Sequence, residues 1–151
     1  MIGPSELYDL LSQLGIEYQY DEHPPVATID EAVKYWKRPD THHCKNLFLR
    51  NHKGDRHYLV LIEHSCNVNI YLLEKKLRQG KLSFASEKRL DKYLGLKPGS
   101  VSPFGLINDT EHHVHVFLDA HLQKAVNIAF HPNDNRATLT IKYDDFTRYL
   151  D

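Results

Sequence analysis

One segment that could do chemistry begins at Lys45 and Asn46. These two polar residues stand at the head of an apolar run that continues to Leu49. Neighbouring residues of a strand point to opposite faces of the sheet, so at least one of the two polar groups faces inward or lies at the rim of a cleft. Taken alone, the same pattern also fits an ordinary lysine on an edge strand.

A second segment, residues 99–105, reads Gly-Ser-Val-Ser-Pro-Phe-Gly. Its two glycines and two hydroxyls predict a tight turn with several exposed backbone N–H groups. Such turns can hold an anion or a developing oxyanion at little reorganisation cost. The segment is not a phosphate-binding P-loop, because the Gly-x-x-x-x-Gly-Lys spacing is absent.

A third segment places His131 at the end of an expected strand, where Pro132 fixes the chain. A histidine in this position could bond a carbonyl or a substrate group. The chain has 11 histidines, so a structural role fits this one equally well.

Metal and thiol chemistry have weaker support. His113 and His115 would share one face of a strand, a spacing that some metal sites use, but no carboxylate or cysteine set accompanies them. The two cysteines, Cys44 and Cys66, form no Cys-x-x-Cys pair, and neither has an evident third residue to complete a nucleophilic site. We therefore expect reduced, buried thiols, no metal site and no cofactor.

Length, composition and charge limit the number of domains and the classes of partner. With 151 residues and 41% hydrophobic residues, we expect one domain over residues 1–151. A net charge of −1 excludes a strongly basic, sequence-blind nucleic-acid binder. The basic stretch between residues 75 and 97 fits either local contact with an RNA backbone or a solvated helix face. No bilayer-length apolar run and no signal peptide is evident, so we expect a cytosolic protein.

The elements that must position these segments follow from periodicity and capping residues. We expect helices at 5–14 (with Ser5 as N-cap), 28–36, 69–78, 86–94 and 144–150. We expect strands at 16–20, 44–49, 58–62, 106–107, 114–118, 125–130 and 137–143, the second and third forming a hairpin. Strands outnumber helices without regular alternation. The predicted class is α+β, a central mixed, mainly antiparallel sheet flanked by helices.

Together, the three segments resemble the YbaK/ProX prolyl-tRNA editing domains. The turn His23-Pro24-Pro25-Val26 with Thr28 also matches, so the resemblance covers nearly the whole chain. Within the family the sequence is most similar to the free-standing alanyl-tRNA(Pro) deacylases. The resemblance implies a cleft that receives the aminoacylated 3′ end of tRNA(Pro), and prolyl-tRNA synthetase as a second partner. It also implies ester hydrolysis without a metal, cofactor or covalent nucleophile, with a ribose hydroxyl of the tRNA helping to activate water.

The resemblance assigns roles to individual residues. Lys45 would hold the ester and terminal adenosine, while the carbonyl oxygen would face backbone N–H groups of Gly99, Ser100, Val101 and Ser102. Asn46 and His131 would bind the substrate. The other substrate-binding residues would be Val26, Thr28, Leu47, Pro103 and Leu106. The charge of the basic stretch, and not the resemblance, leads us to expect contact of the tRNA backbone with Lys75, Lys76, Arg78, Lys88 and Arg89.

A size sieve explains the activity that the resemblance implies. A synthetase pocket built for proline cannot strongly reject alanine, because a missing methylene changes binding by only about 1–3 kcal/mol. A second site that admits alanine and excludes proline would supply the discrimination. Three alternatives stay open: hydrolysis of cysteinyl- or seryl-tRNA by the same fold, a non-catalytic module that binds tRNA or a synthetase, and a metal-dependent hydrolase.

Overall fold

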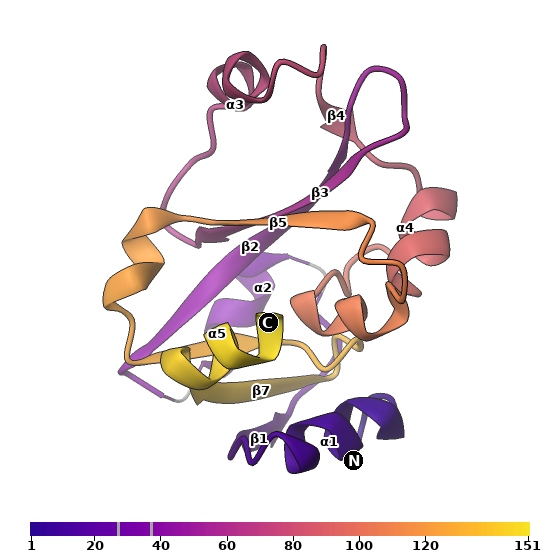
Figure 1. Cartoon of the computed structure of the whole chain (residues 1–151). Coiled ribbons are helices and arrows are strands. Elements are labelled where there is room, and N and C mark those ends of the chain that lie inside the picture. Colours follow the sequence, from indigo (N-terminus) through magenta and orange to yellow (C-terminus); the bar gives the residue numbers. More distant parts are fainter. Residues whose placement is uncertain (27, 37) are drawn as a thin grey trace.

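The computed structural model of the chain describes residues 1–26, 28–36 and 38–151. Seven strands form one sheet in the order β1-β7-β6-β2-β3-β5, with β4 paired to β2 (Figure 1). Two pairs, β2 with β6 and β3 with β5, are parallel, and the other four are antiparallel. The mixed, mainly antiparallel sheet predicted from the sequence is confirmed. Its strands are β1 Gln19–Glu22, β2 Thr41–Arg50, β3 His57–Glu63, β4 Ser83–Phe84, β5 Val114–Leu118, β6 Asn127–Phe130 and β7 Ala137–Lys142.

Helices flank this sheet on both sides. In Figure 1, α5 lies in front of β7 and α2 lies behind β2. The α-helices are α1 Ser5–Gln13, α2 Ile29–Ala32, α3 Ile70–Leu77, α4 Glu87–Leu94 and α5 Tyr143–Leu150. Three 3-10 helices complete the set: η1 Val33–Tyr35, η2 Pro103–Asn108 and η3 Ala120–Lys124. Within the described part of the chain, none of these helices has the length and apolar character that a bilayer span requires.

The hairpin of β2 and β3 buries both of its faces. Phe48, Leu59 and Leu61 point into the main core, which α1, α4, η2 and α5 cover. Leu49 and Val60 point the opposite way, into a smaller cluster beneath α3. Period-two alternation therefore places apolar residues on both faces, which explains why the hairpin sequence is almost continuously hydrophobic.

Strand β2 pairs with β6 along its first residues and with β3 along the rest. The change of partner leaves a gap between β2 and the chain that follows β6. Its first residues, 41–43, run parallel to β6 at residues 127–129. From Cys44 onward β2 pairs with β3 instead. The parallel neighbours β2 and β6 therefore separate after His43, and the chain beyond the end of β6 lies beside a stretch of β2 that no longer bonds to it.

One predicted element is wrong in type. Residues 106–107, expected as a strand, lie in the 3-10 helix η2. The Ser102 hydroxyl accepts a hydrogen bond from Phe104 N–H at 3.1 Å, and Pro103 occupies the first turn. A hydroxyl cap followed by proline is a helix-start signal, and it outweighs the β preference of two apolar residues.

Other expected elements are present with shifted limits. The helix expected at 28–36 is divided into α2 and η1, and the strand expected at 16–20 begins at Gln19 as β1. Ser5 is the first residue of α1 rather than its cap, because Pro4 holds the cap position. Side-chain caps at Asn69 and Ser86 begin α3 and α4, at the positions where these two helices were expected to start.

A network of side chains around the buried His57 lies at the end of the hairpin where β3 begins. His57, with 0% of its surface exposed, accepts from the Arg89 guanidinium at Nε2 (3.1 Å) and contacts His113 Nε2 through Nδ1 (2.9 Å). Its ring also lies 4.3 Å from that of Tyr93. Burial, then the neighbouring His113 and Arg89, lower the pKa of His57 to about 4. The ring is therefore neutral in the folded protein at neutral pH.

We expect this network to make stability fall on mild acidification. An unfolded chain protonates His57 near its ordinary pKa of 6.5, while the folded protein resists protonation until about pH 4. The free energy of unfolding should therefore decrease as pH falls from 6.5 toward 4, by at most about 1.4 kcal/mol per pH unit for each such histidine. His43, whose burial likewise lowers its pKa to about 4, adds to the same slope.

Urea unfolding at about pH 7 and about pH 5 measures this slope. His57→Gln should reduce the loss of stability between the two pH values, whatever it does to stability at either one. His52→Gln, at the exposed tip of the same hairpin, is the matched control. An unchanged pH dependence in His57→Gln would contradict the assignment.

Candidate active site

A cavity of about 270 Å³ occupies the place where β2 and β6 separate. Strand β2 forms one wall, the turn at residues 99–101 a second, and the α2 region a third. His131, which directly follows β6, lines the remaining side. The lining residues are Val26, Thr28, Ala32, Cys44, Lys45, Asn46, Leu47, Gly99, Val101 and His131.

Two side-chain hydrogen bonds hold the three polar segments of the sequence together. Asn46 Nδ2 donates to the carbonyl oxygen of Val101 at 3.0 Å, which joins β2 to the glycine-serine turn. Asn133 Nδ2 donates to the carbonyl oxygen of Phe104 at 3.2 Å, which joins that turn to the loop after β6. Segments far apart in the sequence thus form one rigid rim around the cavity.

Lys45 lies at the edge of this cavity, held by the turn after β3. Its Nζ donates to the carbonyl oxygen of Cys66 at 3.0 Å and lies 3.4 Å from Asn67 Oδ1. Among the described lining residues, Lys45 is the charged one. Both of its acceptors are neutral oxygens, so the ammonium charge remains available to a ligand that carries partial or full negative charge.

Two polar features of the rim have unused hydrogen-bonding capacity. Asn46 Oδ1 is buried and has no partner among the described residues, although its own Nδ2 is fixed on Val101. Buried acceptors are almost always satisfied, so this oxygen points to a ligand donor. Gly99 adopts φ +84°, a left-handed conformation that favours glycine. Within the described chain, neither Gly99 N–H nor Val101 N–H donates to a protein acceptor.

His131 is held as a neutral ring in one tautomer. Its Nδ1 lies 2.8 Å from the carbonyl oxygen of Ala137, so this nitrogen carries the proton and donates. Burial lowers the pKa of His131 despite the opposing effect of that bond. The lone pair of Nε2 therefore remains as an acceptor for a substrate N–H or O–H group.

The Cys44 thiol lines the cavity but is not a nucleophile at neutral pH. It is 7% exposed, and burial, reinforced by Glu63 and Asp119, raises its pKa well above the usual range. The thiolate, which is the reactive form, is therefore scarce. The described residues of the cavity therefore supply no activated nucleophile.

Four predicted site residues do not line the cavity. Ser102 is 0% exposed, and its hydroxyl caps η2 instead of reaching solvent. Ser100 N–H donates to the carbonyl oxygen of Lys97, so it is already occupied. Pro103 is buried and its carbonyl oxygen accepts from Tyr149, while Leu106 packs against the main core.

The predicted tRNA-binding residues divide between two helices. Lys75 and Lys76 belong to α3 and Arg78 is its C-cap, and all three are exposed. Lys88 is exposed on α4. Arg89 is partly buried, and its guanidinium donates to the carbonyl oxygen of Gly54 at 2.8 Å and to His57. Arg89 therefore also ties α4 to the hairpin, and its contact with tRNA stays a prediction.

Two lining residues were not predicted. Ala32 comes from α2 and Cys44 directly precedes Lys45 on β2. The start of α2 was recognisable, because Thr28 Oγ1 accepts from Glu31 N–H at 3.3 Å as a helix cap. That Ala32 of α2 faces the cavity follows only from the packing of α2 over β2.

Comparison with known proteins gives consistent matches. Residues 23–149 match the aminoacyl-tRNA editing domain family. The prolyl-tRNA editing protein ProX of Acetoanaerobium sticklandii is 44% identical over 140 residues, covering 93% of this chain and 85% of that protein. The prolyl-tRNA synthetase associated domain-containing protein 1 of Mus musculus is 32% identical over 149 residues, covering 97% and 88%.

Solved structures agree with the fold. A crystal structure of a candidate trans-editing enzyme for prolyl-tRNA synthetase superposes with a TM-score of 0.69 at 18% identity, covering 96% of this chain and 90% of that one. The crystal structure of hypothetical protein APE2540 superposes with a TM-score of 0.76 at 17% identity, covering 95% and 92%. At these identities the likeness concerns the fold alone.

Proposed function

The chain belongs to the aminoacyl-tRNA editing domain family, and on that premise we propose that this aminoacyl-tRNA deacylase removes alanine from wrongly charged tRNA(Pro). The named activity of the ProX relative, 44% identical, supports tRNA(Pro) as the substrate and action in trans. We propose residues 1–151 as one editing domain that acts in the cytosol, where charged tRNA is used.

The observation that carries the proposal is the rim around the 270 Å³ cavity. It combines a cation at Lys45, an unpartnered acceptor at Asn46 Oδ1 and the N–H groups of Gly99 and Val101. A free α-amino group needs an acceptor, and the ester carbonyl needs donors where negative charge develops. The cavity offers both within one enclosure of amino-acid size.

The proposed reaction is attack of water on the ester carbonyl. The Gly99 and Val101 N–H groups would face the oxyanion, and Lys45 would stabilise the charge that develops on the ester and its leaving ribose oxygen. Asn46 Oδ1 and the neutral Nε2 of His131 would accept from the substrate. Because an aminoacyl ester is already reactive, positioning and charge stabilisation can supply most of the acceleration.

We propose that the tRNA backbone reaches the exposed cations Lys75, Lys76, Arg78 and Lys88. Support comes from the link between Lys45 and the 66–67 turn, which leads directly into α3. A proline–tRNA ligase of Limosilactobacillus fermentum is 32% identical over 128 residues, covering 82% of this chain and 22% of the ligase. This likeness supports a prolyl-tRNA synthetase as a second partner.

Parallel deacylation assays test the proposal. The free chain is given tRNA(Pro) carrying alanine, cysteine, serine or proline, and release of amino acid is followed with and without a chelator. We expect alanine to be released fastest, proline slowest, and no effect of the chelator. Faster release of cysteine or serine would favour the alternative substrates. Binding of all four without hydrolysis would favour a non-catalytic module.

A further inference from the structure

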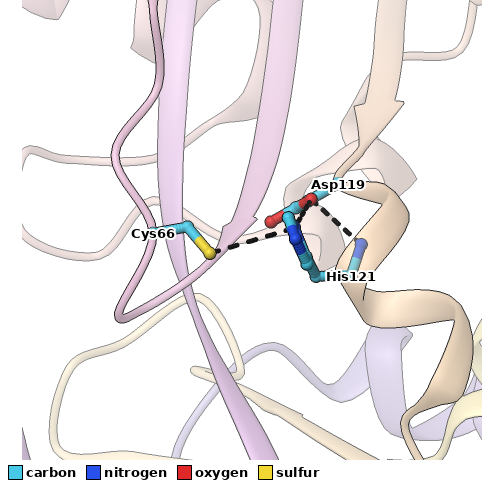
Figure 2. A group of neighbouring side chains, drawn as sticks. All are labelled: Cys66, Asp119 and His121. Atoms are coloured by element: carbon cyan, nitrogen blue, oxygen red, sulfur yellow. Dashed lines mark hydrogen bonds and ion pairs between the residues drawn. The ribbon is translucent and has the colours of Figure 1, made fainter.

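A second cluster of reactive side chains lies outside the editing cavity. Cys66 comes from the turn after β3, whereas Asp119 and His121 come from the start of η3. Figure 2 shows the three side chains pointing toward one another. Cys66 Sγ is 3.9 Å from His121 Nδ1, which is 2.8 Å from Asp119 Oδ1. One ligand atom from each residue lies within 4.8 Å of the others.

The geometry is not that of a catalytic triad. In a cysteine–histidine–aspartate triad, one ring nitrogen faces the sulfur and the other faces the carboxylate, so that a proton can be relayed. Here the same nitrogen, Nδ1 of His121, faces both Cys66 Sγ and Asp119 Oδ1. Sulfur, nitrogen and oxygen therefore converge on one point, as the ligands of a metal ion do.

We propose that Cys66, Asp119 and His121 bind a divalent transition-metal ion, with Zn²⁺ as the best fit. Thiolate, imidazole and carboxylate are the three ligand types that zinc takes in proteins. Bond lengths of about 2.3 Å to sulfur and about 2.0 Å to nitrogen or oxygen place neighbouring ligand atoms of a tetrahedral site about 3.3–3.6 Å apart. The observed separations of 3.9 Å (Sγ to Nδ1) and 2.8 Å (Nδ1 to Oδ1) each differ from that range by about half an ångström or less, so small side-chain rotations would bring the three atoms onto one ion.

Asp119 is already fixed for this role. Its Oδ1 accepts from His121 N–H at 3.0 Å and its Oδ2 from Glu63 N–H at 3.2 Å. These two bonds fix the orientation of the carboxylate, so that Oδ1 also lies 2.8 Å from His121 Nδ1. Metal binding would release the Cys66 thiol proton to solvent, and the His121 ring would carry its proton on Nε2.

The site has an approach path and a candidate fourth ligand. All three residues line a cavity of about 260 Å³ that extends beneath α3. Glu63 Oε2 lies 3.9 Å from Cys66 Sγ but already accepts from Ser65 N–H at 2.9 Å, so we expect a water molecule to complete the coordination. The backbone of Cys66 also accepts from Lys45, which places the metal site on the same turn as the editing cation.

Titration of the intact chain with Co²⁺, a spectroscopic substitute for Zn²⁺, tests the site. We expect one ion per chain, a thiolate-to-cobalt charge-transfer band in the near ultraviolet, and loss of that band when Zn²⁺ is added. Cys66→Ser should abolish the band, and His121→Ala should weaken binding at least tenfold. His115→Ala, which removes an exposed histidine outside the cluster, should leave binding unchanged.

Two outcomes would overturn the proposal: no charge-transfer band in the parent chain, or a band that survives Cys66→Ser. His121 is exposed, so His121→Ala should keep the fold, and unchanged circular dichroism confirms that its loss of binding is local. The site does not rest on the proposed editing activity. Deacylation and metal binding can therefore fail independently of each other.

Discussion

Lys45→Met should lower kcat/KM for deacylation of alanyl-tRNA(Pro) by about 100-fold, the loss typical when one donor to a developing oxyanion is removed. Methionine keeps the length and apolar character of the lysine stem and removes only the charge. Lys45 is the charged residue among the described cavity lining, so no neighbouring cation replaces it. The loss should appear mainly in kcat, because charge on the ester develops in the transition state.

Single-turnover deacylation measures this effect separately from tRNA binding. Lys53→Met, on the exposed tip of the hairpin between β2 and β3, is the matched control and should deacylate at the parent rate. The chain has one tryptophan, and Trp36 stacks on His43 with ring centroids 3.8 Å apart. Its fluorescence reports whether the nearby strand is intact. A folded Lys45→Met protein with parental activity would remove Lys45 from the mechanism.

Local signals in the sequence predicted most of the elements. The strand at 114–118 is found with the same limits, and the caps at Asn69 and Ser86 begin α3 and α4. Capping and alternation depend on residues within a few positions of each other, so they can be read from one sequence. The error at 106–107 is of the same local kind, because the cap at Ser102 was assigned to chemistry instead of structure.

The cleft itself depends on a change of strand partner that no local signal reports. Alternation along β2 predicts a strand, but it does not predict that residues 41–43 pair with β6 and later residues with β3. Likewise, the charge of Arg89 predicted a surface role. Its contact with Gly54, 35 positions away, could be found only from the packing of α4 against the hairpin.

The cluster at Cys66 illustrates the same limit. Closely spaced residues in the sequence predicted no metal site: His113 and His115 lack an accompanying carboxylate or cysteine set, and Cys66 has no Cys-x-x-Cys partner. Cys66 and His121 are 55 positions apart. They meet because β3 and β5 run parallel and side by side, so that the turn after β3 and the start of η3 lie at the same edge of the sheet. Motifs defined by the sequence spacing of metal ligands describe sites whose ligands share one loop or helix. The ligands of this cluster come from two separate segments, so no such motif could reveal it.

Val26→Ala should relax the discrimination between alanine and proline. Val26 is 3% exposed, lines the cavity, and is fixed by a hydrogen bond from its N–H to the carbonyl oxygen of Asn135 at 3.2 Å. The bond holds the backbone in place, and burial leaves the methyl groups little room to move away from a larger substrate. Forcing extra methylenes into a packed site costs about 1–3 kcal/mol. Relief of that cost should raise kcat/KM for prolyl-tRNA(Pro) by about 10-fold or more, with a smaller change for alanine.

The ratio of the two kcat/KM values is the quantity to measure, because it cancels any general loss of active protein. Val114→Ala removes the same atoms from a core valine that is 9% exposed and does not line the editing cavity, so it controls for destabilisation. A steric sieve requires the ratio to change in Val26→Ala and not in Val114→Ala. If the ratio stays at the parent value in Val26→Ala, proline is excluded by something other than the size of this wall, such as the secondary amine that it presents to Asn46 Oδ1.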